Sequence, residues 1–117
     1  MKVLIHGTKS FNQYEIFINA LGRVIRSMDD EDEELIVATL GPTNVTHMAH
    51  EFINISERTL KANGIKAKVW PRTIRWAKSN LEEFDELIYF CKPKEPLSDI
   101  ATLADRKSTI DLAVYRY

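Results

Sequence analysis

The sequence predicts a single α/β domain, a Rossmann-like three-layer α/β/α sandwich around a five-stranded parallel sheet of order 3-2-1-4-5. Its short apolar runs lack the alternation of half-exposed strands, as is typical of strands covered on both faces. Segments with helical periodicity separate these runs, which favours parallel strands joined by helical crossovers. The length of 117 residues suits one domain, so we expect residues 1–117 to form it.

Five apolar segments are expected to be strands. They are residues 2–6, 35–40, 65–70, 86–91 and 109–117. Pro71 is expected to end the third strand, because proline cannot donate a ladder hydrogen bond. Right-handed crossovers place the first strand in the centre of the sheet. The loops at 7–11 and 92–97 should then face each other across a crevice at the switch point, where open α/β sheets bind ligands.

The first helix is expected to begin around residues 11–16. Asn12 and Glu15 have the spacing of a capping box, and Phe11 is placed to staple onto Ile16. Apolar residues then recur at helical spacing and predict the core face of this helix. They are Ile16, Phe17, Ala20, Leu21, Val24, Ile25 and Met28.

Three further helices are expected. Thr43 or Asn44 can cap the second, whose buried side is predicted by apolar residues between 48 and 60. A helix is predicted between residues 72 and 85, where 79–82 repeats the capping-box pattern. Ser98 is expected to cap a fourth helix that runs to about residue 106.

Composition indicates an ordinary soluble protein and a cytoplasmic location. The hydrophobic share is 44%, the charged share is 28% and the net charge is −1, which gives no overall attraction to nucleic acid or anionic lipid. The lone Cys91 excludes an internal disulfide and fits a reducing compartment. No apolar run suits a membrane span or a signal peptide. The acidic run 29–34 is expected to be a solvated loop, with a docking surface for a basic partner as the alternative.

The loop after the first strand carries the best candidate site. Its backbone amides, hydroxyls and ammonium group suit an anion such as phosphate, although it has neither Walker nor GxGxxG spacing. The loops after the second and fourth strands should complete the rim. The predicted ligand-binding residues are Gly7, Thr8, Lys9, Ser10, Gly41, Thr43, Asn44, Thr46, His47 and Lys92.

Metal and nucleophilic chemistry are not favoured. His47, His50 and Glu51 can share one helix face, but their order differs from that of the zinc proteases, so no metal is predicted. Cys91 follows a strand and is expected to be packed and inert. No cofactor is predicted.

A basic segment between residues 58 and 80 contains Trp70 and Trp76. Cations interleaved with aromatic residues can hold single-stranded nucleic acid by charge and stacking. The segment crosses a helix end, a strand and a loop, so its charges need not share a face. Nucleic acid is therefore not the favoured partner.

The chain resembles small members of the SLOG superfamily of Rossmann-like domains, which includes lonely-guy phosphoribohydrolases, DprA-type DNA-processing domains and short phage and bacterial proteins. The resemblance rests on KVLIHGTKS, LIVATLGPTNVTHMAHEF, VWPRTIRWAKSN and ELIYFCKP. It implies the fold and a nucleotide-type ligand. The glycine motifs are degenerate, because Pro42, Val45 and His47 replace two glycines and an acid, and residues 92–96 contain no glycine.

These observations favour a cytoplasmic, non-catalytic module, phage-encoded by resemblance, that binds a nucleotide or another phosphate ligand. Two alternatives stay open. One is a nucleotide-processing enzyme of the N-glycoside hydrolase type, with Glu51 or Asp99 as the acid or base. The other is a protein-interaction factor that binds a host protein. We also expect a homo-oligomer, since Tyr115 and Tyr117 lie on an edge strand that can pair.

Overall fold

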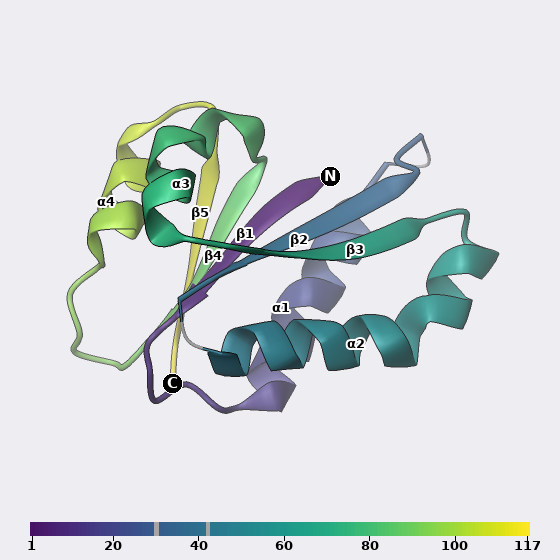
Figure 1. Ribbon diagram of the computed structural model, residues 1–117, viewed down its shortest axis with the longest axis horizontal. Coiled ribbons are helices and arrows are strands. Elements are labelled where there is room, and N and C mark those ends of the chain that lie inside the picture. The colour runs from purple at the N-terminus through teal and green to yellow at the C-terminus, as the bar shows by residue number, and fades with distance from the viewer. Residues whose placement is uncertain (30, 42) are drawn as a thin grey trace.

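The sheet has five parallel strands in the order β3-β2-β1-β4-β5, with helices on both faces (Figure 1). The structure is a computed structural model and describes residues 1–29, 31–41 and 43–117, except for the side chain of Thr43. The predicted fold class and strand order are confirmed. Asp30 of the acidic run and Pro42 of the second loop lie outside the described residues.

The elements follow one another in strict alternation. The strands are β1 (Lys2–Gly7), β2 (Glu34–Leu40), β3 (Lys66–Arg72), β4 (Glu86–Cys91) and β5 (Asp111–Arg116). The helices are α1 (Tyr14–Ser27), α2 (Thr43–Ala62), α3 (Ile74–Ser79) and α4 (Asp99–Arg106), with a 3₁₀ turn η1 at Leu81–Glu83. No helix in the described part of the chain is both long and apolar enough to cross a membrane.

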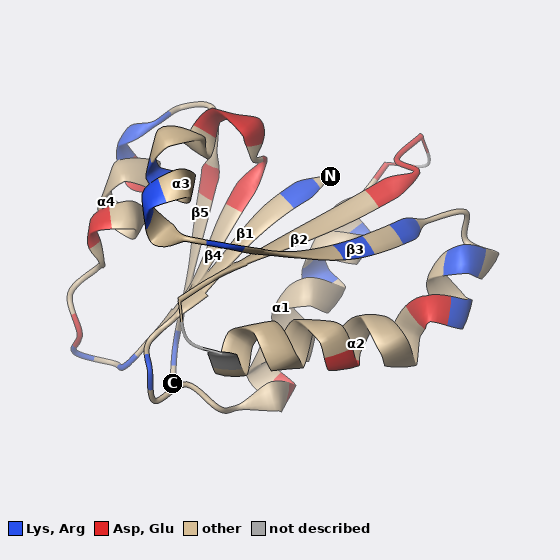
Figure 2. Cartoon of the chain, viewed as in Figure 1, with Lys and Arg blue, Asp and Glu red and all other residues tan. Residues whose placement is uncertain are grey.

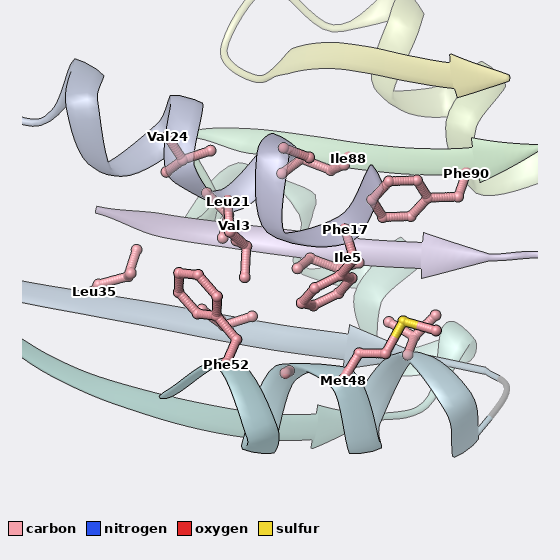
Figure 3. Close-up of a cluster of buried hydrophobic side chains, with 14 of the residues drawn as sticks. Val3, Ile5, Phe17, Leu21, Val24, Leu35, Met48, Phe52, Ile88 and Phe90 are labelled. Carbon is pink, nitrogen blue, oxygen red and sulfur yellow. The ribbon is translucent and has the colours of Figure 1, made fainter. Parts of the chain in front are cut away.

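The sheet has a separate apolar core on each face. Val3 and Ile5 of β1 face α1 and α2, where Phe17, Phe52 and their neighbours fill the space (Figure 3). The alternate strand residues face α3 and α4 and pack with buried residues of those helices. Strands covered on both faces need apolar residues at every position, which explains the continuous runs in the sequence.

The two faces are not covered to the same extent. Figure 1 shows α3 and α4 over the β4–β5 end of the sheet, whereas β3 runs clear of them along most of its length. The short α3 has only six residues, about two turns, so it cannot extend along β3. The opposite face of β3 is covered by α2.

The start of α1 differs from the prediction. The helix begins at Tyr14, and its N-cap Gln13 makes no side-chain capping hydrogen bond, so the capping box of Asn12 and Glu15 is wrong. Phe11 is completely buried and its ring stacks on Phe90 at 4.3 Å. Burial of this ring outweighs the weaker capping preference and holds the chain extended to Gln13. The predicted core face of α1 is confirmed.

The end of β3 also differs. The strand continues through Pro71, which is in register with Thr39 of β2, so the predicted end at residue 70 is wrong. Because β3 lies at the sheet edge, its outer N–H groups need no ladder partner and proline is tolerated there.

The predicted caps were right in part. Ser98 Oγ accepts a hydrogen bond from the Ala101 amide, as expected for the N-cap of α4. Asn44 lies inside α2 and its side chain donates to the Phe11 carbonyl, so it is not the cap. The pattern at 79–82 does not start an α-helix, because α3 is capped earlier by Thr73 and ends at Ser79.

Candidate functional site

A cleft of about 740 Å³ opens at the carboxyl ends of β1 and β4, where the chain passes to opposite sides of the sheet. It is lined by His6, Gly7, Thr8, Lys9, Ser10, Gly41, Ile74, Tyr89, Lys92 and Glu95. The loops after the two central strands form its opposite walls. This is the switch point at which ligands bind in related architectures.

Six of the ten predicted ligand-binding residues line this cleft, and Asn44, Thr46 and His47 do not. Those that line it are Gly7, Thr8, Lys9, Ser10, Gly41 and Lys92. Asn44 bonds to the loop backbone from α2, Thr46 Oγ1 bonds to Thr39 Oγ1 at 2.8 Å, and His47 is exposed. The side chain of Thr43 lies outside the described residues. The buried residues of α2 pack on the opposite face of the sheet from Tyr89 of the cleft.

The loop after β1 is fixed by backbone hydrogen bonds and by the buried side chain of Phe11. The Thr8 amide donates to the Phe90 carbonyl at 3.1 Å, and the Phe11 amide donates to the Thr8 carbonyl at 3.0 Å. The buried Phe11 ring anchors the end of the loop. Among the described residues, the amides of Lys9 and Ser10 have no hydrogen-bond partner. These two amides are available to an anion at the tip of the loop.

Tyr117 engages the hydroxyl groups of the same loop. Its Oη hydrogen-bonds to Thr8 Oγ1 and lies 2.9 Å from Ser10 Oγ. The Thr8 and Ser10 hydroxyls are predicted as ligand groups, but in the structure they hydrogen-bond to the Tyr117 hydroxyl, just after β5. The donor groups at the tip of this loop that no described residue engages are therefore the amides of Lys9 and Ser10 and the Lys9 ammonium.

The loop after β4 is held by Arg116. Its Nη1 donates to the carbonyls of Lys92, Pro93 and Glu95 at 3.0, 3.2 and 2.8 Å. Glu95 closes the turn, because its carboxylate accepts from the Lys92 amide at 3.2 Å. A turn fixed in this way needs no glycine. Arg116 and Tyr117 thus each fix one of the two cleft loops.

The rim of the cleft carries two ammonium groups. Figure 2 shows basic positions on the loops after β1 and β4, which include Lys9 and Lys92. Neither lysine has an ion-pair partner within the described part of the chain. Glu95 is the carboxylate of the lining, and its hydrogen bond to the Lys92 amide turns it toward the backbone. The opening therefore favours an anion.

The floor of the cleft is aromatic. His6 stacks on Tyr89 with 5.2 Å between ring centroids and is 8% exposed. Its Nδ1 is buried without a hydrogen-bond partner in the described residues. Burial lowers the pKa of His6, and the nearby Leu40 carbonyl opposes this in part without making a hydrogen bond of normal geometry to Nδ1. His6 is thus a neutral ring with one unused nitrogen beside the cleft.

Sequence reasoning did not select His6, Ile74, Tyr89 or Glu95 as ligand residues. The alternation of β1 and β4 would place His6 and Tyr89 on the same face as Leu4 and Leu87, so strand parity was an available signal. Glu95 reaches the cleft through the conformation of its loop and Ile74 through the position of α3, and the sequence specifies neither.

His50 and Cys91, the other groups with possible metal-binding or nucleophilic chemistry, do not line the cleft. His50 is exposed on α2, and Cys91 is completely buried in β4, where burial raises the pKa of its thiol. Protonated and inaccessible, Cys91 is no nucleophile. In residues 1–29, 31–41 and 43–117 no three His, Cys, Asp or Glu side chains gather as a metal site requires.

His6 makes stability depend on pH. Its pKa is lowered in the folded state, so the unfolded chain binds its proton first as the pH falls below about 6.5. The contribution of neutral His6 is present in full above that value and is lost toward the lower folded pKa. We expect the free energy of unfolding to fall between about pH 7.5 and 5, and to fall less in His6→Phe. Urea unfolding at both pH values measures this.

The matched control is His50→Ala, which removes an exposed histidine and should leave the wild-type pH dependence unchanged. If His6→Phe loses stability between the two pH values as steeply as the wild type, His6 does not cause the dependence.

No protein-family model, curated protein or solved structure matches the chain.

Proposed function

We propose that this domain is a non-catalytic module that binds a phosphate-bearing small molecule of the nucleotide class in the cleft between β1 and β4. The observation that carries the proposal is that Lys9 and Lys92 line the same cleft as the stacked rings of His6 and Tyr89. Such a cleft offers cations to a phosphate and flat apolar surfaces to a base. The volume of about 740 Å³ is within the range of small-molecule sites.

The phosphate would lie at the tip of the loop after β1. The amides of Lys9 and Ser10 are unused among the described residues, and successive backbone amides form a concave anion site. The Lys9 and Lys92 side chains, both exposed, can add charge-assisted hydrogen bonds from either side. The loop is already fixed by Phe11 and Tyr117, so binding costs little ordering entropy.

The base would lie deeper, against Tyr89, His6 and the exposed Ile74. The Nδ1 atom of His6 is buried and has no hydrogen-bond partner in the described residues, so the polar edge of this ring is not offered to a ligand as the structure stands. A nucleobase has the flat face that this floor requires. A bare phosphate would contact only the lysines and the loop amides, and would leave the aromatic rings without a ligand.

The arrangement of carboxylates supports binding without catalysis. Glu51 is exposed on α2, and Asp99 pairs with Lys78 at 3.7 Å on α4; neither lines the cleft. Glu95 lines it but serves the turn of its own loop. A glycoside hydrolase needs a carboxyl group beside the scissile bond. The resemblance to SLOG domains, the phage origin it implies and the expected homo-oligomer belong to this proposal.

A nucleotide panel tests the function. A ligand that binds only the native state raises the free energy of unfolding, by about 2.7 kcal/mol when the free ligand concentration is one hundred times Kd, and so raises the melting temperature. We expect a shift with mono- or dinucleotides, including cyclic dinucleotides and ADP-ribose, and loss of that shift in Lys9→Ala. Lys94→Ala is the matched control, since Lys94 is exposed on the same rim loop but does not line the cleft.

Two results would overturn the proposal. One is a panel in which no nucleotide shifts the melting temperature. The other is a shift that Lys9→Ala and Lys92→Ala both retain, which would move the site elsewhere. Chromatography of the ligand after incubation with the protein tests the absence of catalysis, and any conversion would favour an enzyme that uses Glu95.

A further inference from the structure

We propose that a second site, the β3 face, binds single-stranded nucleic acid. We define the β3 face as Lys2 of β1, Lys68, Trp70 and Arg72 of β3, and Trp76 of α3. It lies on the sheet face that carries α3 and α4, mainly along β3, which runs clear of the two helices for most of its length (Figure 1). Its residues and its ligand are separate from those of the cleft.

The register of the sheet brings these residues together. Lys2 is in register with Ile36 and Ile36 with Lys68, so the two lysines share one row across three strands. Side chains alternate along a strand, so Lys68, Trp70 and Arg72 project from the same side of β3. The sequence argument against nucleic acid was that the charges of this segment need not share a face. In the structure, Lys68 and Arg72 share one with an indole between them.

Arg72 connects the two indoles. Its guanidinium lies 4.8 Å from the ring centre of Trp70 and 5.3 Å from that of Trp76. Lys2 Nζ lies 5.9 Å from the centre of the Trp70 ring. Trp76 is held edge-on against Phe84 at 5.9 Å. Indole and guanidinium planes are the surfaces on which unpaired bases stack.

The face is open at this point. Pro71, Arg72, Thr73 and Trp76 line a shallow hollow of about 400 Å³. Trp70 and Trp76 are both partly exposed, so their rings can be reached from solvent. A base entering the hollow can extend the stack that Arg72 has begun. Its phosphates would then pass Lys68 and Lys2.

The charges of the β3 face are not neutralised by the described residues. Lys2, Lys68 and Arg72 make no salt bridge, whereas the nearby Lys78 and Lys107 pair with Asp99 and Glu82. Acidic groups border the face at its amino end, where Glu34 is in register with Lys66, and Asp85 accepts from the Lys2 amide. The cationic part is therefore short. It suits a few phosphates of one strand.

The aromatic groups decide the class of partner. An acidic peptide would gain from the cations but would leave the two indole faces without a matching group. A duplex buries its base faces, and a flat strand edge offers no helix for its major groove. Single-stranded DNA or RNA uses both the charges and the rings.

The test measures anisotropy of labelled oligothymidylate and oligouridylate of about 16 nucleotides at about 50 mM salt. We expect binding that quenches tryptophan fluorescence, weakens about 10-fold or more in K68Q/R72Q, and loses about 1.4 from the slope of log affinity against log salt in that variant. Trp76→Ala, on the surface of α3, should weaken binding about 10-fold while leaving the salt slope unchanged. R58Q, which removes an exposed cation from α2, is the matched control.

The proposal is overturned if neither oligonucleotide binds, if K68Q/R72Q binds as tightly as R58Q, or if duplex DNA or polyglutamate binds more tightly than the single strand. Circular dichroism and melting temperature establish that each variant is folded. The two sites are separable, because Lys9→Ala should keep the oligonucleotide affinity and K68Q/R72Q should keep the nucleotide-induced shift.

Discussion

Replacing Phe11 by alanine is expected to lower the free energy of unfolding by about 3–5 kcal/mol, the usual cost of removing a buried aromatic ring. The Phe11 ring is 0% exposed and lies 4.3 Å from Phe90 and 5.1 Å from Tyr117, measured between centroids. Its removal leaves a cavity beneath the loop after β1. Since domains of this size are stable by about 5–15 kcal/mol, the loss is a large share of the total.

Urea unfolding measures this loss, and Ile55→Ala is its control. Ile55 is 69% exposed on α2, so its truncation should change stability by less than about 0.5 kcal/mol. The nucleotide-induced shift in melting temperature should also be smaller in Phe11→Ala, because the loop tip is no longer fixed. A stability loss in Phe11→Ala no larger than that of Ile55→Ala would show that the loop is not anchored by this ring.

Gly7→Ala is expected to destabilise the protein by about 1–3 kcal/mol through overpacking. A Cβ at Gly7 would lie 3.0 Å from Val45 Cγ2, and Val45 is completely buried between β1 and α2. Gly7 itself is in register with Phe90 in the sheet, so neither side can move without disturbing the core. Thermal or urea unfolding measures the change.

Gly22→Ala is the matched control, with the opposite sign expected. Its Cβ would approach only Arg26 Nη1, at 3.1 Å, and the end of that exposed side chain can move away. Alanine in the interior of α1 should then stabilise the protein by about 0.5–1 kcal/mol. If Gly7→Ala is as stable as Gly22→Ala, the contact between β1 and α2 is not close.

The order of the elements was predictable because it depends on two patterns that are local in the sequence, the apolar strand segments and the helical segments between them. Strands such as β2 and β4 are covered on both faces and are therefore apolar at nearly every position. Helices between them impose parallel pairing and the central position of β1. The errors lie at the element ends. Asn12 does not cap α1, because the burial of Phe11 stabilises a later helix start. Pro71 is part of β3, because proline is tolerated in a strand at the sheet edge.

The cleft was predictable in position but only partly in its residues. Its place follows from strand order, so the turn at residues 7–10 and Lys92 could be chosen from the sequence. The contacts that shape it are long-range. Thr8 and Tyr117 are 109 residues apart and meet only in the complete sheet. No local pattern shows that Tyr117 hydrogen-bonds to the two hydroxyls of the first loop, or that Glu95 lines the cleft.

The anchoring of both cleft loops by Arg116 and Tyr117 affects the order of folding during synthesis. Loop 7–11 is synthesised before β5, but its contact with Tyr117 requires that this last of the five strands has paired with the sheet. The sheet from β3 to β4 can assemble first, with both loops still loose. The cleft would then become rigid only when β5 docks along β4, so ligand-binding competence would be acquired last and in a single step.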